Sequence, residues 1–131
     1  MASRTAPLKV YLAEDSAEIR ARIGVLLAAE PVDMVIVGEG ATPRRCIAGI
    51  LACRPDVVVL DVQLEGGSGL QVLQAVRSAD PEVAFVVFSN NSAPAYRKRY
   101  LGEGAVCFLD KSTEFDQLAR AVVTASRRAV H

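Results

Sequence analysis

The sequence lacks an excess of charge of either sign. Its 131 residues include 15 lysines and arginines and 15 aspartates and glutamates, so the formal net charge at pH 7 is zero. Proteins that bind nucleic acid or anionic membranes through their overall field carry a positive excess. The composition therefore argues against direct nucleic-acid binding and against attachment to a membrane surface.

Long apolar runs are also missing. No run approaches the roughly 20 residues that cross a bilayer, and residues 1–7 lack the apolar centre of a secretory signal peptide. We therefore expect no membrane-embedded part and a location in the cytoplasm.

Cysteine is scarce and unpaired in the sequence. Cys46, Cys53 and Cys107 are an odd number with no close pair, and the only histidine is His131. Disulfide frameworks and zinc sites need paired or clustered ligands. The sequence predicts buried or half-buried thiols in a reducing compartment instead.

What the sequence does contain is an alternation of two kinds of segment. Five short, almost continuous apolar runs lie at residues 8–13, 32–37, 57–60, 83–88 and 105–109. They lack polar alternation, which is typical of strands covered on both faces in a parallel sheet.

Segments with helical spacing of apolar residues follow each of these runs. They lie at 19–27, after Thr42, at 70–76, at 92–103 with a weaker pattern, and at 115–123. Asp15 and Glu18 predict a capping pair for the first helix, and Thr42 before a proline predicts the start of the second. Ser112 or Thr113 is the predicted cap of the last helix.

The order is therefore five βα units, and right-handed crossovers arrange such units as a doubly wound parallel sheet with helices on both faces. We predict an α/β fold with five parallel strands. The length fits a single domain over residues 1–131, with its core at about 8–125.

Polar residues end four of the five predicted strands. These residues are Glu14 and Asp15 after the first strand, Asp61 after the third, Ser89 at the end of the fourth, and Asp110 and Lys111 at the end of the fifth. In open α/β sheets the carboxyl ends of the strands form the binding site. We therefore expect these side chains to meet at one edge of the sheet.

Three clustered carboxylates cannot all stay ionised without a cation or raised pKa values. Oxygen-only ligands favour Mg²⁺, which also keeps water and phosphate ligands. An ammonium and a hydroxyl beside the cluster suit the oxygens of a phosphoryl group. Asp61 is the natural acceptor because it would lie between the metal and Lys111.

This pattern resembles the response-regulator receiver domains of two-component signalling, and the resemblance runs from about residue 8 to residue 125. The matching features are the pair Glu14-Asp15, the aspartate Asp61 with a loop into Gly69-Leu70, the hydroxyl residue Ser89, the lysine Lys111, and Phe108 three positions before it. The resemblance implies the flavodoxin-like (βα)5 receiver fold.

The resemblance implies a Mg²⁺ site and a phosphoacceptor. Asp15 and Asp61 would hold the ion with the backbone carbonyl of Gln63, and Glu14 would act largely through water. Asp61 would attack a phosphohistidine or a small phosphodonor. The domain would thus be a signalling domain that promotes only its own phosphorylation and dephosphorylation, and not an enzyme.

The same resemblance implies a switch. Lys111 and Ser89 would hold the phosphoryl oxygens, and movement of Ser89 would let Phe108 swing inward. This would alter the surface of the helix at 92–103, the strand at 105–109 and the last helix, where partners dock. Gln63 and Asn91 occupy the positions that tune dephosphorylation.

The expected partners follow from the family. They are a histidine kinase or histidine phosphotransfer protein, an unidentified output protein on that surface, and a second copy in a homodimer. The basic cluster at residues 96–100 is the only segment that hints at nucleic acid, and a solvated helix face is the favoured interpretation.

Three positions depart from the family pattern. Ser112 stands where proline usually follows the lysine, often through a cis bond. Asn90 stands where a small residue is usual and could crowd a phosphodonor, and Glu65 stands where proline is frequent.

Three other readings compete with a phosphorylated receiver. A phosphatase of the haloacid-dehalogenase type wants a second aspartate two residues after the nucleophile, where Gln63 stands. A flavodoxin-like cofactor module requires a glycine- and hydroxyl-rich phosphate-binding loop after the first strand, where this sequence has the acidic segment 14–18. A receiver that signals without phosphorylation stays open.

Overall fold

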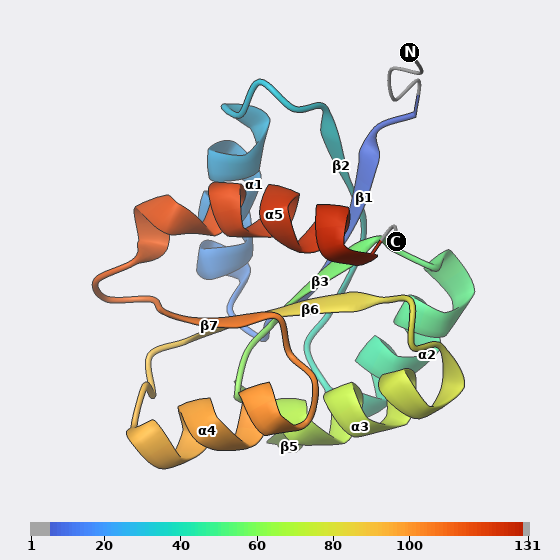
Figure 1. Ribbon diagram of the computed structural model, residues 1–131, viewed down its shortest axis with the longest axis vertical. Helices are drawn as coiled ribbons and strands as arrows, with labels where there is room; N and C mark the ends of the chain where they lie inside the picture. Colours follow the sequence, from blue (N-terminus) through green and yellow to red (C-terminus); the bar gives the residue numbers. More distant parts are fainter. Residues whose placement is uncertain (1–5, 130–131) are drawn as a thin grey trace.

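The computed structural model describes residues 6–129 (Figure 1). The ends of the predicted domain, residues 1–5 and 130–131, lie outside the described part. Within that part, none of the helices is long and apolar enough to cross a bilayer.

A single five-stranded parallel sheet forms the centre of the molecule, in the order β2-β1-β3-β6-β7. Its strands are β1 (Leu8–Ala13), β2 (Met34–Gly40), β3 (Val57–Leu60), β6 (Ala84–Ser89) and β7 (Cys107–Asp110). The predicted doubly wound fold is confirmed. The strand order reverses between β1 and β3, which places a binding site at their carboxyl ends.

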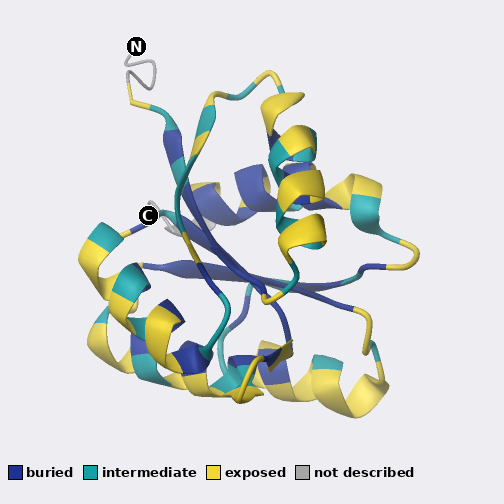
Figure 2. Cartoon of the chain, turned by 180° about the vertical axis from the view of Figure 1, so that it is seen from behind, coloured by how far each residue is buried: buried dark blue, intermediate teal, exposed yellow. Residues whose placement is uncertain are grey.

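Helices cover both faces of the sheet. They are α1 (Ala17–Ala28), α2 (Pro43–Cys53), α3 (Gly69–Ala79), α4 (Pro94–Gly102), the short 3₁₀ helix η1 (Phe115–Gln117) and α5 (Leu118–Ala129). Helices α1 and α5 pack on one face, and α2, α3 and α4 pack on the other (Figure 1). Strands β1, β3 and β6 are mostly dark blue between the partly yellow helices in Figure 2, because continuous apolar strands need cover on both sides. The edge strand β2 is less buried.

A small antiparallel pair, β4 (Gln63–Leu64) and β5 (Gly67–Ser68), lies between β3 and α3. The apolar pattern did not predict it, because two-residue strands carry no measurable periodicity.

The helix starts differ partly from the predictions. Thr42 caps α2 by accepting the backbone N–H of Arg45 at 3.2 Å, as predicted. The Asp15–Glu18 pair does not cap α1. Ser16 does so, because its hydroxyl accepts the N–H of Ile19 at 3.2 Å.

The start of the last helix is also corrected. Neither Ser112 nor Thr113 caps it, because the chain first closes a turn in which the N–H of Glu114 donates to the carbonyl of Asp110 at 2.8 Å. The helix begins only after that turn, with η1. Helix α5 continues past the predicted core limit near 125, and Ser126 is buried.

Strand β2 extends beyond the predicted residues 32–37 to include Gly38 and Gly40. Both glycines lie against the buried ring of Tyr11 on β1, and so does Gly49 on α2. A Cβ atom at any of the three positions would lie within 2.6–2.8 Å of the Tyr11 side chain. The glycines therefore make room for the ring.

Candidate functional site

The carboxyl ends of four strands bring the predicted polar residues together. Glu14 and Asp15 follow β1, Asp61 follows β3, Ser89 is the last residue of β6, and Lys111 follows β7. The predicted convergence at one edge of the sheet is confirmed.

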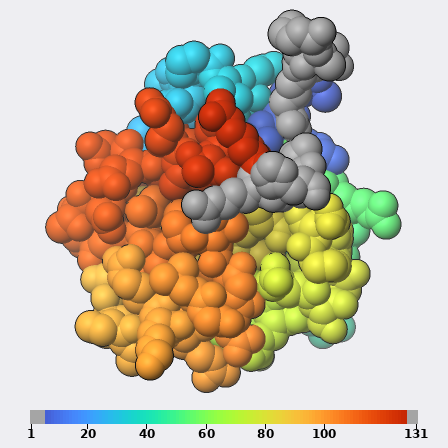
Figure 3. Space-filling view, in the orientation of Figure 1, coloured from blue at the N-terminus to red at the C-terminus, as the bar shows by residue number. Residues whose placement is uncertain are grey.

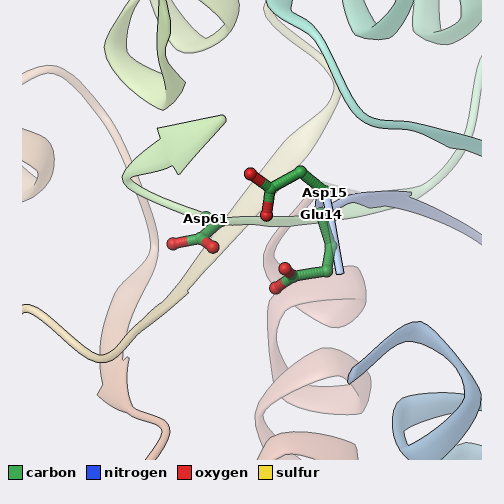
Figure 4. Close-up of side chains that lie close together, drawn as sticks. All are labelled: Glu14, Asp15 and Asp61. Atoms are coloured by element: carbon green, nitrogen blue, oxygen red, sulfur yellow. The ribbon is translucent and has the colours of Figure 1, made fainter. Parts of the chain in front are cut away.

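Three carboxylates form a tight cluster at this edge (Figure 4). Glu14, Asp15 and Asp61 each offer an oxygen atom, and these atoms all lie within 4.8 Å of one another. Glu14 and Asp61 are buried, whereas Asp15 is exposed. The cluster thus reaches from the interior to the surface.

Lys111 supplies the positive charge beside this cluster. Its Nζ donates a hydrogen bond to Oδ2 of Asp61 at 2.9 Å and another to Oε1 of Glu14. The second oxygen of Glu14 accepts the backbone N–H of Ser16 at 3.0 Å. Protein groups therefore engage both oxygens of Glu14.

The electrostatics follow from burial and pairing. Burial alone would lower the pKa of Lys111, but its hydrogen bonds to the Glu14 and Asp61 carboxylates outweigh burial and raise the pKa above its usual value. Burial raises the pKa of Glu14, against the opposing effect of its hydrogen bond to Lys111. The hydrogen bond from Lys111 is thus the main effect that favours the charged form of Glu14.

One ammonium does not balance three carboxylates. Asp15 extends the cluster to the surface, where a hard divalent cation can reach the oxygens. Carboxylates at this separation are the ligands that Mg²⁺ prefers, so Glu14, Asp15 and Asp61 can hold a metal ion.

An open pocket of about 330 Å³ lies over the cluster. The residues that line it are Asp15, Asp61, Gln63, Ser89, Asn90 and Asn91. The buried Ser89 hydroxyl accepts the backbone N–H of Asn91 at 3.0 Å. The pocket lining therefore combines two carboxylates with a hydroxyl and three side-chain amides.

Of the departures from the family pattern, Asn90 lines the pocket and Ser112 contacts Asn90. Asn90 and Ser112 are both exposed, and the Ser112 hydroxyl donates to Oδ1 of Asn90 at 3.4 Å. The described residues contain no cis peptide bond, so the bond between Lys111 and Ser112 is trans.

Phe108 is buried in β7. Its ring packs edge-to-face against Tyr100 of α4, with 6.1 Å between ring centres. The guanidinium of Arg97 lies 5.1 Å above the same ring, and its Nη1 donates to the Phe108 carbonyl at 2.9 Å.

The prediction of a solvated face at 96–100 is correct for Tyr96, Lys98 and Arg99, which are exposed. It is wrong for Arg97 and Tyr100, because both pack against β7. The spacing of this short helix carried no clear apolar stripe that would have separated the two groups.

Comparison with known proteins agrees with this geometry. A family model for the response regulator receiver domain matches residues 10–123. The response regulator domain of Thermotoga maritima CheB shares the fold, with a TM-score of 0.80 over 95% of this chain and 96% of that one at 24% identity.

Curated relatives match over the same region. The DNA-binding transcriptional activator DevR/DosR of Mycobacterium tuberculosis is 30% identical over 115 residues, which are 88% of this chain and 52% of the relative. The transcriptional regulatory protein DesR of Bacillus subtilis is 26% identical over 115 residues, 88% of this chain and 56% of the relative. The chain thus spans about half the length of these relatives. With the family model covering most of its length, the chain belongs to the response regulator receiver domain family of two-component signalling.

Proposed function

We propose that Asp61 is the phosphoacceptor of this receiver domain. The observation that carries the proposal is the 2.9 Å hydrogen bond from Lys111 Nζ to Oδ2 of Asp61, at the floor of a pocket that Ser89 also lines. This arrangement leaves a carboxylate facing an open pocket with a cation and a hydroxyl beside it.

The chemistry is a phosphoryl transfer from a histidine kinase or a histidine phosphotransfer protein. A carboxylate oxygen of Asp61 attacks the phosphorus of a phosphohistidine, an O–P bond forms and the N–P bond breaks. The leaving imidazole nitrogen keeps the electron pair and takes up a proton. Lys111 and Ser89 hold the phosphoryl oxygens as charge builds on them.

Asp15 and Asp61, together with the backbone carbonyl of Gln63, would hold Mg²⁺ at this site. The ion supplies positive charge that offsets the repulsion between the carboxylates and the incoming phosphoryl group. Glu14 already binds Lys111 and the Ser16 N–H, which supports a role through water rather than direct ligation.

Gln63 and Asn91 are proposed to tune the lifetime of the phosphorylated state. Both are exposed and line the pocket over Asp61. Their amides stand where they can orient a water molecule for attack on the acyl phosphate.

Ser89 and Phe108 are proposed to couple phosphorylation to a conformational change at the surface. When the Ser89 hydroxyl turns toward the phosphoryl group, it gives up the Asn91 N–H, and Phe108 shifts toward the space that opens. The consequence appears on the face formed by α4, β7 and α5, which run side by side in the space-filling view (Figure 3). A cavity of about 500 Å³ between β7 and α5 lies on this face.

That face is where an output protein or a second copy of the chain would dock. Several relatives are transcriptional regulators by name, and we propose regulation of such an output by a receiver in the cytoplasm, where kinases present phosphohistidine.

The test is the intact mass of the protein after incubation with acetyl phosphate, with and without Mg²⁺. We expect one phosphoryl group on the wild type only with Mg²⁺, none on Asp61→Asn, and an unchanged adduct on the matched control Asp33→Asn, which lies away from the site. Lys111→Ala should still bind Mg²⁺ but respond poorly to phosphorylation.

An adduct on Asp61→Asn would overturn the site assignment. No adduct on the wild type would instead favour a receiver that signals without phosphorylation.

A further inference from the structure

Two loops carry the groups that are proposed to hold the phosphoryl oxygens. The loop between β6 and α4 follows Ser89, and the turn between β7 and η1 contains Lys111. The sheet already joins the two backbones, because the N–H of Lys111 donates to the carbonyl of Ser89 at 3.0 Å. The direction of the Ser89 hydroxyl depends instead on the loop, since the N–H of Asn91 donates to that hydroxyl at 3.0 Å.

Asp110 joins the two loops through one carboxylate. Its Oδ2 accepts the hydroxyl of Ser92 at 2.5 Å, and its Oδ1 accepts the backbone N–H of Ser112 at 2.7 Å. Ser92 is 18 residues away in the sequence. The contact is therefore tertiary, unlike the bond of an ordinary aspartate turn.

The backbone of Asp110 is fixed as well. Its N–H donates to Oε1 of Glu114 at 2.9 Å, and its carbonyl accepts the N–H of Glu114 at 2.8 Å. The residue thus engages every polar group it has, directly before Lys111 in the chain.

The bond to Ser112 is available only because this position is not proline. Proline has no N–H to donate, whereas Ser112 follows a trans bond and donates to Asp110. Hydrogen bonds therefore fix the conformation of this turn.

We propose that Asp110 is a positioning residue: it holds the loop that follows Ser89 against the turn that carries Lys111, and so orients the hydroxyl and the ammonium for phosphoryl transfer. This inference rests on the proposed phosphorylation of Asp61. It adds a residue that touches neither the metal nor the phosphoryl group.

A carboxylate suits this role better than its neutral relatives. Two oxygens serve two donors from two loops, whereas asparagine offers one acceptor oxygen and alanine offers none. Hydrogen bonds from the Ser92 hydroxyl and the Ser112 N–H lower the pKa of Asp110, which agrees with a charge held in place by its donors.

The experiment measures the initial rate of Mg²⁺-dependent phosphorylation by acetyl phosphate for Asp110→Ala, Ser92→Ala and the double variant. We expect each single variant to lose on the order of tenfold in rate, because small errors of position have large effects on transfer. The double variant should lose no more than the slower single variant, since both changes break the same contact.

Conservative replacements provide the rescue. Ser92→Thr keeps the hydroxyl and should stay within about twofold of the wild type, and Asp110→Asn should lie between the wild type and Asp110→Ala. Asp33→Ala is the matched control and should keep the wild-type rate. A thermal shift with Mg²⁺ should be the same for all variants, because none changes the metal cluster.

A folded Asp110→Ala protein with the wild-type rate would overturn the inference, and so would losses that add in the double variant. These outcomes differ from a failure of the proposed function, in which the wild type itself gains no phosphoryl group. In that case, amide exchange still tests the contact: the Ser112 N–H should lose its protection in Asp110→Ala and retain it in Asp33→Ala.

Discussion

Tyr100 is the residue through which α4 reaches the loop that follows Asp61. Its hydroxyl donates to the carbonyl of Val62 at 3.4 Å, and its ring lies against Phe108. Burial raises the pKa of Tyr100 to about 12. A side chain that packs against Phe108 thus also carries a pH dependence.

The alkaline stability of the protein should report on Tyr100. The folded protein keeps this phenolic proton up to about pH 12, whereas the unfolded chain loses it near pH 10. The unfolded state binds fewer protons in this interval, so stability falls as pH rises. At pH 11 the loss due to Tyr100 is about 1.4 kcal/mol.

We expect the stability of Tyr100→Phe to fall less between pH 8 and pH 11 than that of the wild type, because the variant lacks this phenol. The free energy of unfolding in urea, measured for both proteins at pH 8 and pH 11, gives the difference. Tyr11, whose pKa is also raised by burial, is present in both proteins and cancels. Equal losses in the two proteins would contradict the prediction.

Single residues differ in how well the sequence predicts their place. Asp61, Ser89 and Lys111 were predictable because strand ends fix where they meet. The contact of Asp110 with Ser92 was not, because it depends on a loop conformation that apolar periodicity does not encode. The contact of Arg97 with Phe108 was not predictable either, because it depends on how α4 packs against β7.

Helix α3 depends on a glycine at its first residue. A Cβ atom at Gly69 would lie 2.0 Å from the backbone carbonyl oxygen of Asp61. The N–H of Gly69 also donates to the carbonyl of Val62 at 2.8 Å. The start of the helix therefore lies directly against the segment that carries the proposed phosphoacceptor.

Gly69→Ala should destabilise the protein by about 3 kcal/mol, because the clash is with backbone that cannot rotate away. Gly102→Ala at the end of α4 is the matched control, since nothing lies within 4 Å of a Cβ atom there. The control should be more stable than the wild type by roughly 0.4–1 kcal/mol, because alanine reduces the conformational entropy of the unfolded chain. Urea unfolding measures both, and equal effects at the two positions would contradict the argument.

The five strands of the main sheet and the five α-helices were predictable in number and type but not at their ends. The strands are apolar because both faces are covered, and that pattern is visible in the sequence. The end of β2 was missed because glycines such as Gly38 and Gly40 favour a turn in the sequence. Their role in accommodating the Tyr11 ring is visible only in the structure. The cap of α1 was missed because Asp15 and Ser16 are both residues that commonly cap helices, and Asp15 belongs instead to the carboxylate cluster.

At the scale of the whole molecule, the carboxylate cluster is a local negative charge that Lys111 only partly compensates, in a chain with no net charge. A cation that binds only the folded protein stabilises it by mass action. The stability of the entire fold should therefore depend on Mg²⁺.

At a Mg²⁺ concentration about ten times the dissociation constant, the free energy of unfolding rises by about 1.4 kcal/mol. This rise corresponds to an increase in Tm of roughly 3–6 °C. We expect this rise in the wild type and in Asp33→Asn but not in Asp15→Asn. Without metal, Asp15→Asn should be at least as stable as the wild type, because removing one charge relieves repulsion. An equal rise in all three proteins would place the ion elsewhere.

The packing of Tyr11 against Gly38, Gly40 and Gly49 joins four positions on three different elements. None of the three glycines can gain a side chain while the tyrosine ring stays. In descendants of this sequence, a smaller residue must replace Tyr11 before any of these glycines is replaced. Once a glycine has been replaced, a return to tyrosine at position 11 would produce a steric clash. The order of substitutions at these four positions is therefore constrained, and their effects are epistatic.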